Sequence, residues 1–199
     1  MRVAGVILAG GLSRRMGGGD KALLPLAGKP LLAHVIGRLA PQVEALILNA
    51  NGDPARFSDF GLPVVPDIDE NCSGPLAGIL AVVTHVRQAL PHIEAIVSIP
   101  ADTPFAPSDL VARLEGASSN ADVAMATSAG RDHPTVALWR VSLREPLASA
   151  LSRDERRVLS FIEGQKHARV DWPTESFDPF ANINSPDDLA RAETVAARL

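Results

Sequence analysis

Short apolar runs alternate with stretches of helical periodicity along the chain. The first run, residues 3–8, is uninterrupted and is closely followed by Gly10-Gly11, which is typical of a parallel strand covered on both faces. Residues 31–39 and 76–83 instead repeat apolar positions at helical spacing, and Pro30 suits a first helical turn. The pattern predicts strands over 3–8, 45–48, 63–65, 93–99, 123–126 and 135–139, and helices over 31–39, 76–83 and 109–114.

The last helix has the clearest start signal. Ser185 is a favoured N-cap residue, and Pro186 follows it at the first helical position. Asp187 and Asp188 then lie beside the positive end of the helix dipole. Together these residues predict a helix that begins at Pro186.

Alternation of strands and helices predicts a mostly parallel sheet with helices on both faces, a Rossmann-like three-layer α/β sandwich. Ligands of such sheets bind outside the carboxyl ends of the strands, so polar residues that directly follow predicted strands are candidates for a site. No repeat, low-complexity segment or composition break divides residues 1–199, and we therefore expect a single domain.

Composition narrows the class of ligand. The net charge of −4 provides no general attraction for nucleic acid or an anionic membrane, so an anion must be bound by local groups. Two Trp and no Tyr leave no aromatic stripe for stacking nucleic-acid bases.

The N-terminal apolar run is too short to span a bilayer and lacks a signal-peptide cleavage site. Cys72, the sole cysteine, cannot form an intrachain disulfide, and we expect a soluble cytoplasmic protein.

The strongest chemical signal follows the first predicted strand. Glycines at 10–11 and 17–19 let backbone N–H groups approach an anion, and Arg15 and Lys21 add positive charge suited to a triphosphate. A glycine-rich turn with solvated cations is the alternative for each feature alone, but their combination in one loop favours phosphate binding. Two better-known nucleotide motifs do not fit this loop. Residues 17–22 match the dinucleotide pattern G-x-G-x-x-A but do not directly follow a strand, and Ala22 replaces the Ser or Thr that binds magnesium in a Walker A loop.

Asp102 is the strongest candidate for a metal ligand. It follows the predicted strand over 93–99 and should lie at that strand's carboxyl end. Mg²⁺ takes oxygen ligands, commonly one or two carboxylates together with phosphates and water. Capping of the turn before Pro104 is the alternative role for this carboxylate.

Further candidates follow other strands or begin a helix. Asn49 and Asp67 come just after predicted strands, where polar side chains are candidates for a ligand site, although an Asx-turn and a loop acid explain them equally well. Gly74 and Gly78 flank the start of a helix, where free N–H groups favour phosphate and small residues also permit tight packing. His133 is more typical of a packed polar residue than of a catalyst.

Several strings carry a family resemblance that extends over nearly the whole chain. The most specific are L-A-G-G-x-S-x-R-M-G-x-x-D-K at 8–21, followed by L-L-P-L-A-G-K-P-L-L at 23–32, and D-P-F-A-N-I-N-S-P at 178–186. Between them lie N-A-N at 49–51, V-P-D at 65–67, G-P-L-A-G-I at 74–79, P-A-D-T-P-F at 100–105, H-P at 133–134 and E-R-R-V at 155–158. The chain resembles the nucleotidyltransferases with a glycosyltransferase-A-like fold, and among them the molybdenum cofactor guanylyltransferases.

The resemblance implies transfer of GMP from GTP to molybdopterin, with Mg²⁺ as cofactor and pyrophosphate as the second product. It assigns Asp102 to the metal and the nucleotide phosphates. We expect Asp102 to be catalytic together with Arg15 and Lys21, which neutralise charge during transfer. The expected GTP site comprises Leu8, Ala9, Gly10, Gly11, Lys21, Asn49, Asp67 and Asp102, and the expected acceptor site comprises Gly74, Gly78, Arg157, Asn182 and Asn184. Ala101 stands where family members often have Cys, which excludes thiol chemistry at that position.

Other activities stay open on the sequence. A cytidylyltransferase acting on the same cofactor and a nucleotidyltransferase acting on another small-molecule phosphate are the nearest. The resemblance favours GTP, because Ala9-Gly10-Gly11 stands where the cytidylyl relatives have Ala-Ala-Gly. A GTP-binding regulatory module would use the same loop but would need no metal at the reacting phosphate. We expect a monomer that binds GTP and molybdopterin, with cofactor-insertion proteins and apo-molybdoenzymes as further candidate partners and no nucleic-acid or membrane partner.

Overall fold

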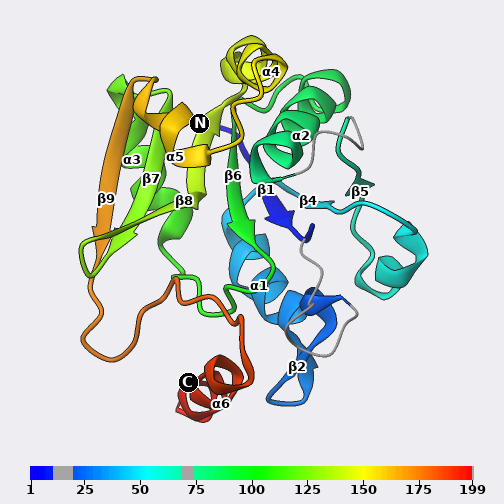
Figure 1. Cartoon of the computed structure of the whole chain (residues 1–199), viewed down its shortest axis with the longest axis vertical. Helices are drawn as coiled ribbons and strands as arrows, with labels where there is room; N and C mark the ends of the chain where they lie inside the picture. Colours follow the sequence, from blue (N-terminus) through cyan, green and yellow to red (C-terminus); the bar gives the residue numbers. More distant parts are fainter. Residues whose placement is uncertain (11–19, 69–73, 199) are drawn as a thin grey trace.

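Seven strands form one sheet through the middle of the molecule (Figure 1). They are β1 Val3–Leu8, β4 Ala45–Asn49, β5 Val64–Val65, β6 Ala95–Pro100, β7 Val123–Ser128, β8 Arg131–Arg140 and β9 His167–Trp172, in the spatial order β5-β4-β1-β6-β8-β7-β9. The structure is a computed structural model that describes residues 1–10, 20–68 and 74–198. All neighbouring strands pair in parallel except β8, which runs antiparallel to β6 and β7.

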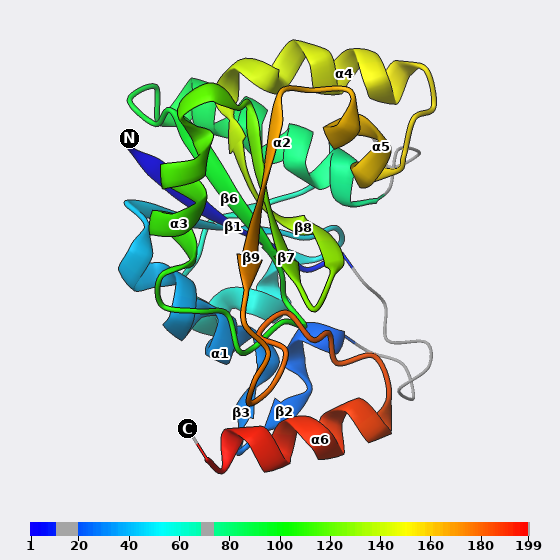
Figure 2. The same cartoon turned by 90° about the vertical axis from the view of Figure 1, so that its left-hand side faces the viewer.

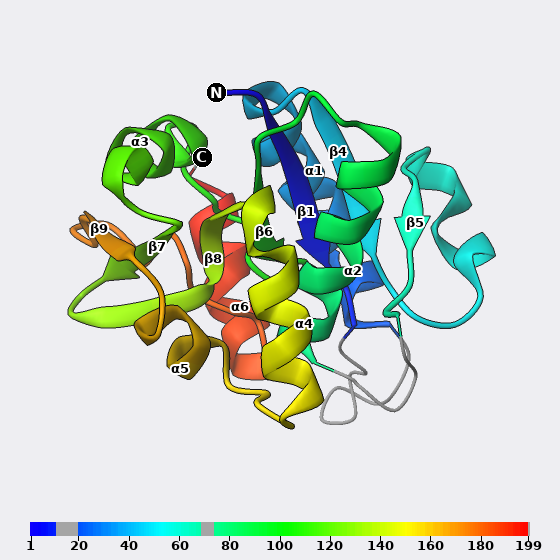
Figure 3. The same cartoon turned by 90° about the horizontal axis from the view of Figure 1, so that it is seen from above.

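Helices cover both faces of this sheet (Figure 3). They are α1 Leu31–Leu39, α2 Pro75–Ala89, α3 Leu110–Ala117, α4 Arg144–Ser152 and α5 Val158–Glu163, while a further helix, α6 Pro186–Ala196, lies away from both faces. Residues of α1 and α3 share one apolar core with the sheet, and residues of α2, α4 and α5 share a second core on the opposite face. The predicted three-layer α/β sandwich with a mostly parallel sheet is confirmed. Among the described residues, no helix is long and apolar enough to cross a bilayer.

The second half of the chain contains elements that the apolar pattern did not predict. The edge strand β9 carries His167, Arg169 and Asp171 between its less polar residues, so it lacks a continuous apolar run. Helix α4 buries only Leu147 and Ala150, which leaves a weak helical period, and α5 is only six residues long. Pro30 also differs from its predicted place, because it caps α1 from outside and Leu31 is the first helical residue.

Helix α6 packs below the sheet against a two-stranded hairpin, β2 Pro25–Leu26 and β3 Lys29–Pro30 (Figure 2). Their contact forms a third apolar cluster that includes Leu26, Ile183 and Ala192. The predicted start of α6 is confirmed: the Ser185 hydroxyl accepts the Asp188 N–H at 3.2 Å. The segment just before α6 lies beside Lys21, whose Nζ donates to the side-chain oxygen of Asn184.

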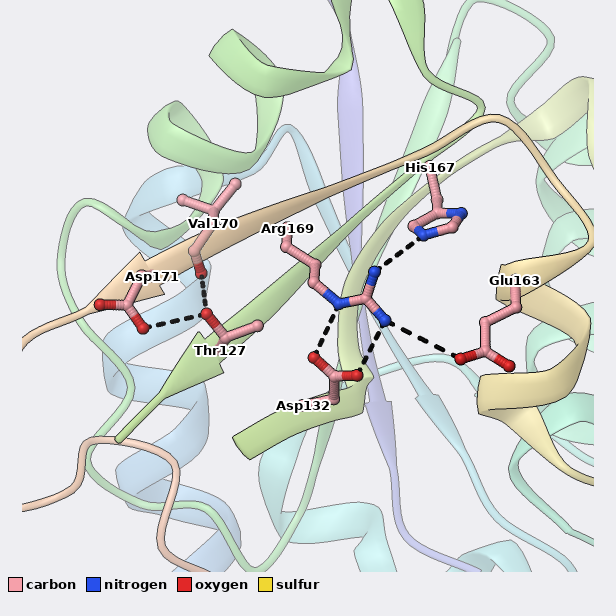
Figure 4. A network of polar contacts seen from close by, with 7 residues as sticks. All are labelled: Thr127, Asp132, Glu163, His167, Arg169, Val170 and Asp171. Atoms are coloured by element: carbon pink, nitrogen blue, oxygen red, sulfur yellow. Dashed lines mark hydrogen bonds and ion pairs between the residues drawn. The ribbon is translucent and has the colours of Figure 1, made fainter. Parts of the chain in front are cut away.

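Polar side chains link β7, β8 and β9 at the edge of the sheet (Figure 4). Arg169 donates from Nε and Nη2 to the two carboxylate oxygens of Asp132, at 2.9 and 3.0 Å. Its Nη2 also lies 3.9 Å from Glu163, and its Nη1 lies 3.0 Å from Nε2 of His167. The guanidinium hydrogen bonds hold the pKa of Asp132 below its usual value.

Replacing Asp132 by Asn should therefore weaken the fold in a pH-dependent way. A carboxyl whose pKa is lowered by folding stabilises the native state above its unfolded pKa, and this contribution disappears as pH falls through the folded pKa. Because both side chains reach solvent, we expect a loss of no more than about 1 kcal/mol at pH 7. Urea unfolding at pH 7 and at a pH far enough below 3.8 to protonate Asp132 in the folded state measures it, with exposed Asp59→Asn as the control. A loss that persisted at acid pH would show that charge pairing is not its origin.

Candidate active site

A cavity of about 320 Å³ opens at the carboxyl ends of β1, β4 and β6. Backbone hydrogen bonds join these strand ends: the Ala9 N–H donates to the Asn49 carbonyl at 2.9 Å, and the Ala101 N–H donates to the Leu8 carbonyl at 3.0 Å. This is the place where parallel sheets bind ligands. Of the residues predicted for the site, the cavity wall contains Leu8, Ala9, Gly10, Lys21, Asn49, Asp67, Gly74, Asp102 and Asn182.

Asp102 lies in the turn after β6, with 15% of its side chain exposed. Its Oδ2 forms an ion pair with Nζ of Lys21, which also donates to the side-chain oxygen of Asn184. The other carboxylate oxygen, Oδ1, is buried and has no hydrogen-bond partner among the described residues. A buried carboxylate oxygen without a partner is costly unless a ligand contacts it, so Oδ1 is the atom available for a cation.

Asn49 and Asp67 are in direct contact across the cavity wall. The Asn49 amide donates both to the Val65 carbonyl and to Oδ1 of Asp67, each at 3.0 Å. Asn51 holds the same carboxylate from its other side, donating to Oδ2 at 2.8 Å. Asn51 had no predicted role, although its spacing of two residues from Asn49 places both on one face of an extended segment.

The two glycines near the start of α2 serve different purposes. Gly74 is the N-cap of α2, lines the cavity and has φ 130°, a conformation that other residues rarely adopt. Gly78 does not line the cavity. A Cβ on Gly78 would lie 2.1 Å from Oδ1 of Asn49, so its hydrogen side chain lets the helix pack against that amide. For Gly78, the structure supports the packing interpretation.

A family model described as a MobA-like NTP transferase domain matches residues 5–170. The chain belongs to the MobA-like NTP transferase family. A molybdenum cofactor guanylyltransferase of Bradyrhizobium sp. (strain ORS 278) is 54% identical over 98% of this chain and 93% of its own length. A protein of the same name from Rhodopseudomonas palustris (strain BisB5) is 53% identical over 97% of this chain and 93% of its own.

Solved structures share this fold. The molybdopterin-guanine dinucleotide biosynthesis protein A of Archaeoglobus fulgidus superimposes with a TM-score of 0.76 at 27% identity and covers 100% of both chains. A 4-diphosphocytidyl-2C-methyl-D-erythritol synthase of Anaerococcus prevotii has a TM-score of 0.73 at 12% identity, which supports the fold alone.

The residues that family resemblance assigned to the acceptor are not all gathered at the cavity. Asn182 lines it and accepts a hydrogen bond from the Thr103 hydroxyl at 3.3 Å. Asn184 does not line it but accepts a hydrogen bond from Lys21, which does. Arg157 is exposed, directly precedes α5 and does not line the cavity. Gly11 and Arg15 lie outside the described residues, so their roles stay predictions.

His133 takes part in a chain of hydrogen bonds within the fold. Its Nε2 lies 2.6 Å from the Ser128 hydroxyl, which in turn donates to Asp178 at 2.8 Å. Since the single hydroxyl hydrogen of Ser128 is used on Asp178, His133 must donate from Nε2. Burial lowers the pKa of His133, which favours the neutral ring. These contacts tie β7 and β8 to the segment that leads to Asn182, as expected for a packed polar residue.

Proposed function

We infer that this MobA-like NTP transferase transfers GMP from GTP to molybdopterin and releases pyrophosphate. The relatives that are about half identical over nearly the whole chain bear the name molybdenum cofactor guanylyltransferase. The observation that carries the inference is the placement of Asp102, which lies at the rim of the sheet beside Lys21 with one buried oxygen unpartnered among the described residues. An acid and a cation placed together at a nucleotide-sized cavity suit the charges of a triphosphate.

We further propose that Asp102 holds Mg²⁺ through Oδ1. Within the described residues no three His, Cys, Asp or Glu side chains gather as a metal cage, so the cation would take its other ligands from nucleotide phosphates and water. Magnesium bound in this way supplies charge stabilisation at the triphosphate. Lys21, already paired with Oδ2, would keep the carboxylate oriented.

The proposed chemistry needs no strong general base. A phosphate oxygen of molybdopterin forms a bond to the α-phosphorus of GTP, and the bond between that phosphorus and the β-phosphate oxygen breaks. A phosphate monoester is mostly dianionic near pH 7, since its second pKa is about 6, and it can attack without losing a further proton. Catalysis then depends on positioning the two substrates and on the positive charge of Lys21 and, by prediction, Arg15.

Two alternatives have less support. The half-identical relatives are guanylyltransferases by name, so a cytidylyl activity is not favoured. A regulatory module that binds GTP without turnover has no use for an unpartnered acidic oxygen at the reacting phosphates. Delivery to insertion proteins and apo-molybdoenzymes, the monomeric state and the cytoplasmic location stay predictions.

GTP with Mg²⁺ should stabilise the protein more than ATP, CTP or UTP does. A ligand present at 100 times its Kd stabilises the native state by about 2.7 kcal/mol, which raises Tm by roughly 5–10 °C for a domain of this size. Thermal-shift measurements with each nucleotide, with and without Mg²⁺, test the preference. Pyrophosphate release upon addition of molybdopterin then distinguishes an enzyme from a binding module. A larger shift with CTP would instead support the cytidylyl activity.

A further inference from the structure

Asn51 and Asp67 are joined by two hydrogen bonds at the cavity wall. The Asn51 amide donates from Nδ2 to Oδ2 of Asp67 at 2.8 Å, and its Oδ1 accepts the backbone N–H of Asp67 at 2.8 Å. Asn51 therefore fixes both the carboxylate and the backbone that carries it. A side chain held at two points this close together has few orientations left.

Asn51 is itself held through its backbone carbonyl. Arg56 donates from Nη2 to the Asn51 carbonyl, and its Nε lies 2.8 Å from the carboxylate of Asp20, the neighbour of Lys21 in the sequence. The next residue, Gly52, has φ 83°, and a Cβ there would lie 2.8 Å from Nη1 of Arg56. Gly52 therefore leaves room for this arginine. Arg56 in turn connects the backbone of Asn51 to Asp20, the residue before Lys21.

The contacts on Asp67 leave it as an acceptor toward the cavity. Asn49 donates to one carboxylate oxygen and Asn51 donates to the other, so each oxygen has one amide partner. An ionised carboxylate offers about four acceptor sites and no donor, which leaves roughly two sites for a ligand. Since Asp67 and Asn51 both line the cavity, a ligand edge with two adjacent N–H donors would match them.

We propose that Asn51 is a positioning residue that sets the base preference of this site, by holding the Asp67 carboxylate ready for two adjacent N–H donors. Guanine presents such a pair at N1 and the 2-amino group. Adenine and cytosine place a ring acceptor beside their amino group, and uracil has one N–H between two carbonyls. This inference rests on the proposed function and deepens it, because it assigns the preference for GTP to a residue outside the predicted GTP site.

The test compares GTP with two analogues in wild type, Asn51→Ala and Asn51→Asp. ITP lacks only the 2-amino group, and dGTP lacks only the 2′-hydroxyl. Leaving an acceptor unpaired in a site built for hydrogen bonding commonly costs about tenfold or more in affinity, so wild type should bind ITP about 10–100-fold more weakly than GTP. In Asn51→Ala, the affinity for GTP should exceed the affinity for ITP by about threefold or less. The ratio of the affinities for GTP and dGTP, and the affinity for inorganic triphosphate, should stay unchanged within about twofold.

Two further variants separate positioning from a general effect. Asn51→Asp keeps the size of the side chain but places a second carboxylate against Asp67, and it should lower the GTP to ITP ratio at least as far. Asn120→Ala is the matched control. Asn120 is exposed and lies near the start of β7, at the opposite end of the sheet from the cavity, so this variant should keep the wild-type ratio of affinities for GTP and ITP.

Other outcomes overturn the inference in distinguishable ways. If Asn51→Ala narrows the GTP to dGTP ratio and leaves the GTP to ITP ratio unchanged, Asp67 contacts the ribose and the inference is wrong. If wild type binds GTP and ITP equally, the donor pair is not recognised, although the proposed transfer of GMP can still stand. If wild type binds no GTP in the presence of Mg²⁺, the proposed function itself fails.

Discussion

Asp102→Asn is expected to fold normally and to lose about 10²–10³-fold in the rate of GMP transfer. Asparagine has the shape of aspartate and can still accept from Lys21, so the turn after β6 should persist. It lacks the negative charge that would hold a divalent cation at Oδ1, the buried oxygen with no partner among the described residues. The loss should appear mainly in kcat, because the base and ribose contacts predicted at Leu8, Asn49 and Asp67 remain.

Single-turnover assays with GTP, molybdopterin and Mg²⁺ measure this effect, and Tm reports on the fold. Asp59→Asn removes the same charge at an exposed position and should leave turnover unchanged within about twofold. Raising the Mg²⁺ concentration should recover little of the lost rate. Near-normal turnover in Asp102→Asn would show that the carboxylate neither holds the metal nor serves catalysis.

Residues that directly follow an uninterrupted apolar run could be located from sequence. Leu8 is the last residue of β1, and Asp102 closely follows β6. Both strands are central and are buried along most of their length. Because parallel strands end on the same edge of a sheet, their order in space matters little for predicting that such residues meet. The start of α6 was also readable, since an N-cap acts within one helical turn.

The role of Asn51 could not be read in this way because it depends on strand register. Asn49 pairs with Val65 in the sheet, and the contact between Asn51 and Asp67 continues that register by two residues beyond both strands. β5 has two residues, which is too short for a pattern to fix its alignment. The same limit applies to the salt bridge between Arg56 and Asp20, which joins segments that no local signal connects.

Gly78→Ala is expected to destabilise the fold by about 1–3 kcal/mol, the usual cost of adding a methyl group to a packed interior. The new Cβ would lie 2.1 Å from Oδ1 and 2.8 Å from Cγ of Asn49, a side chain in a residue that is only 5% exposed. Asn49 would have to move, and its hydrogen bonds to the Val65 carbonyl and to Asp67 would be lost or weakened. The affinity for GTP should therefore fall by about tenfold or more, as for the loss of a hydrogen bond to a charged group.

Gly37 provides the matched control, because it lies within α1 and a Cβ added there would meet nothing within 4 Å. Alanine has the higher helix propensity by about 1 kcal/mol, so Gly37→Ala should stabilise the protein and leave the affinity for GTP unchanged. The same substitution in two helices is thus expected to change the free energy of unfolding with opposite signs. Urea unfolding and GTP titration of the two variants measure both effects. If Gly78→Ala stabilised the fold as Gly37→Ala does, close packing of α2 on Asn49 could not be what requires glycine at that position.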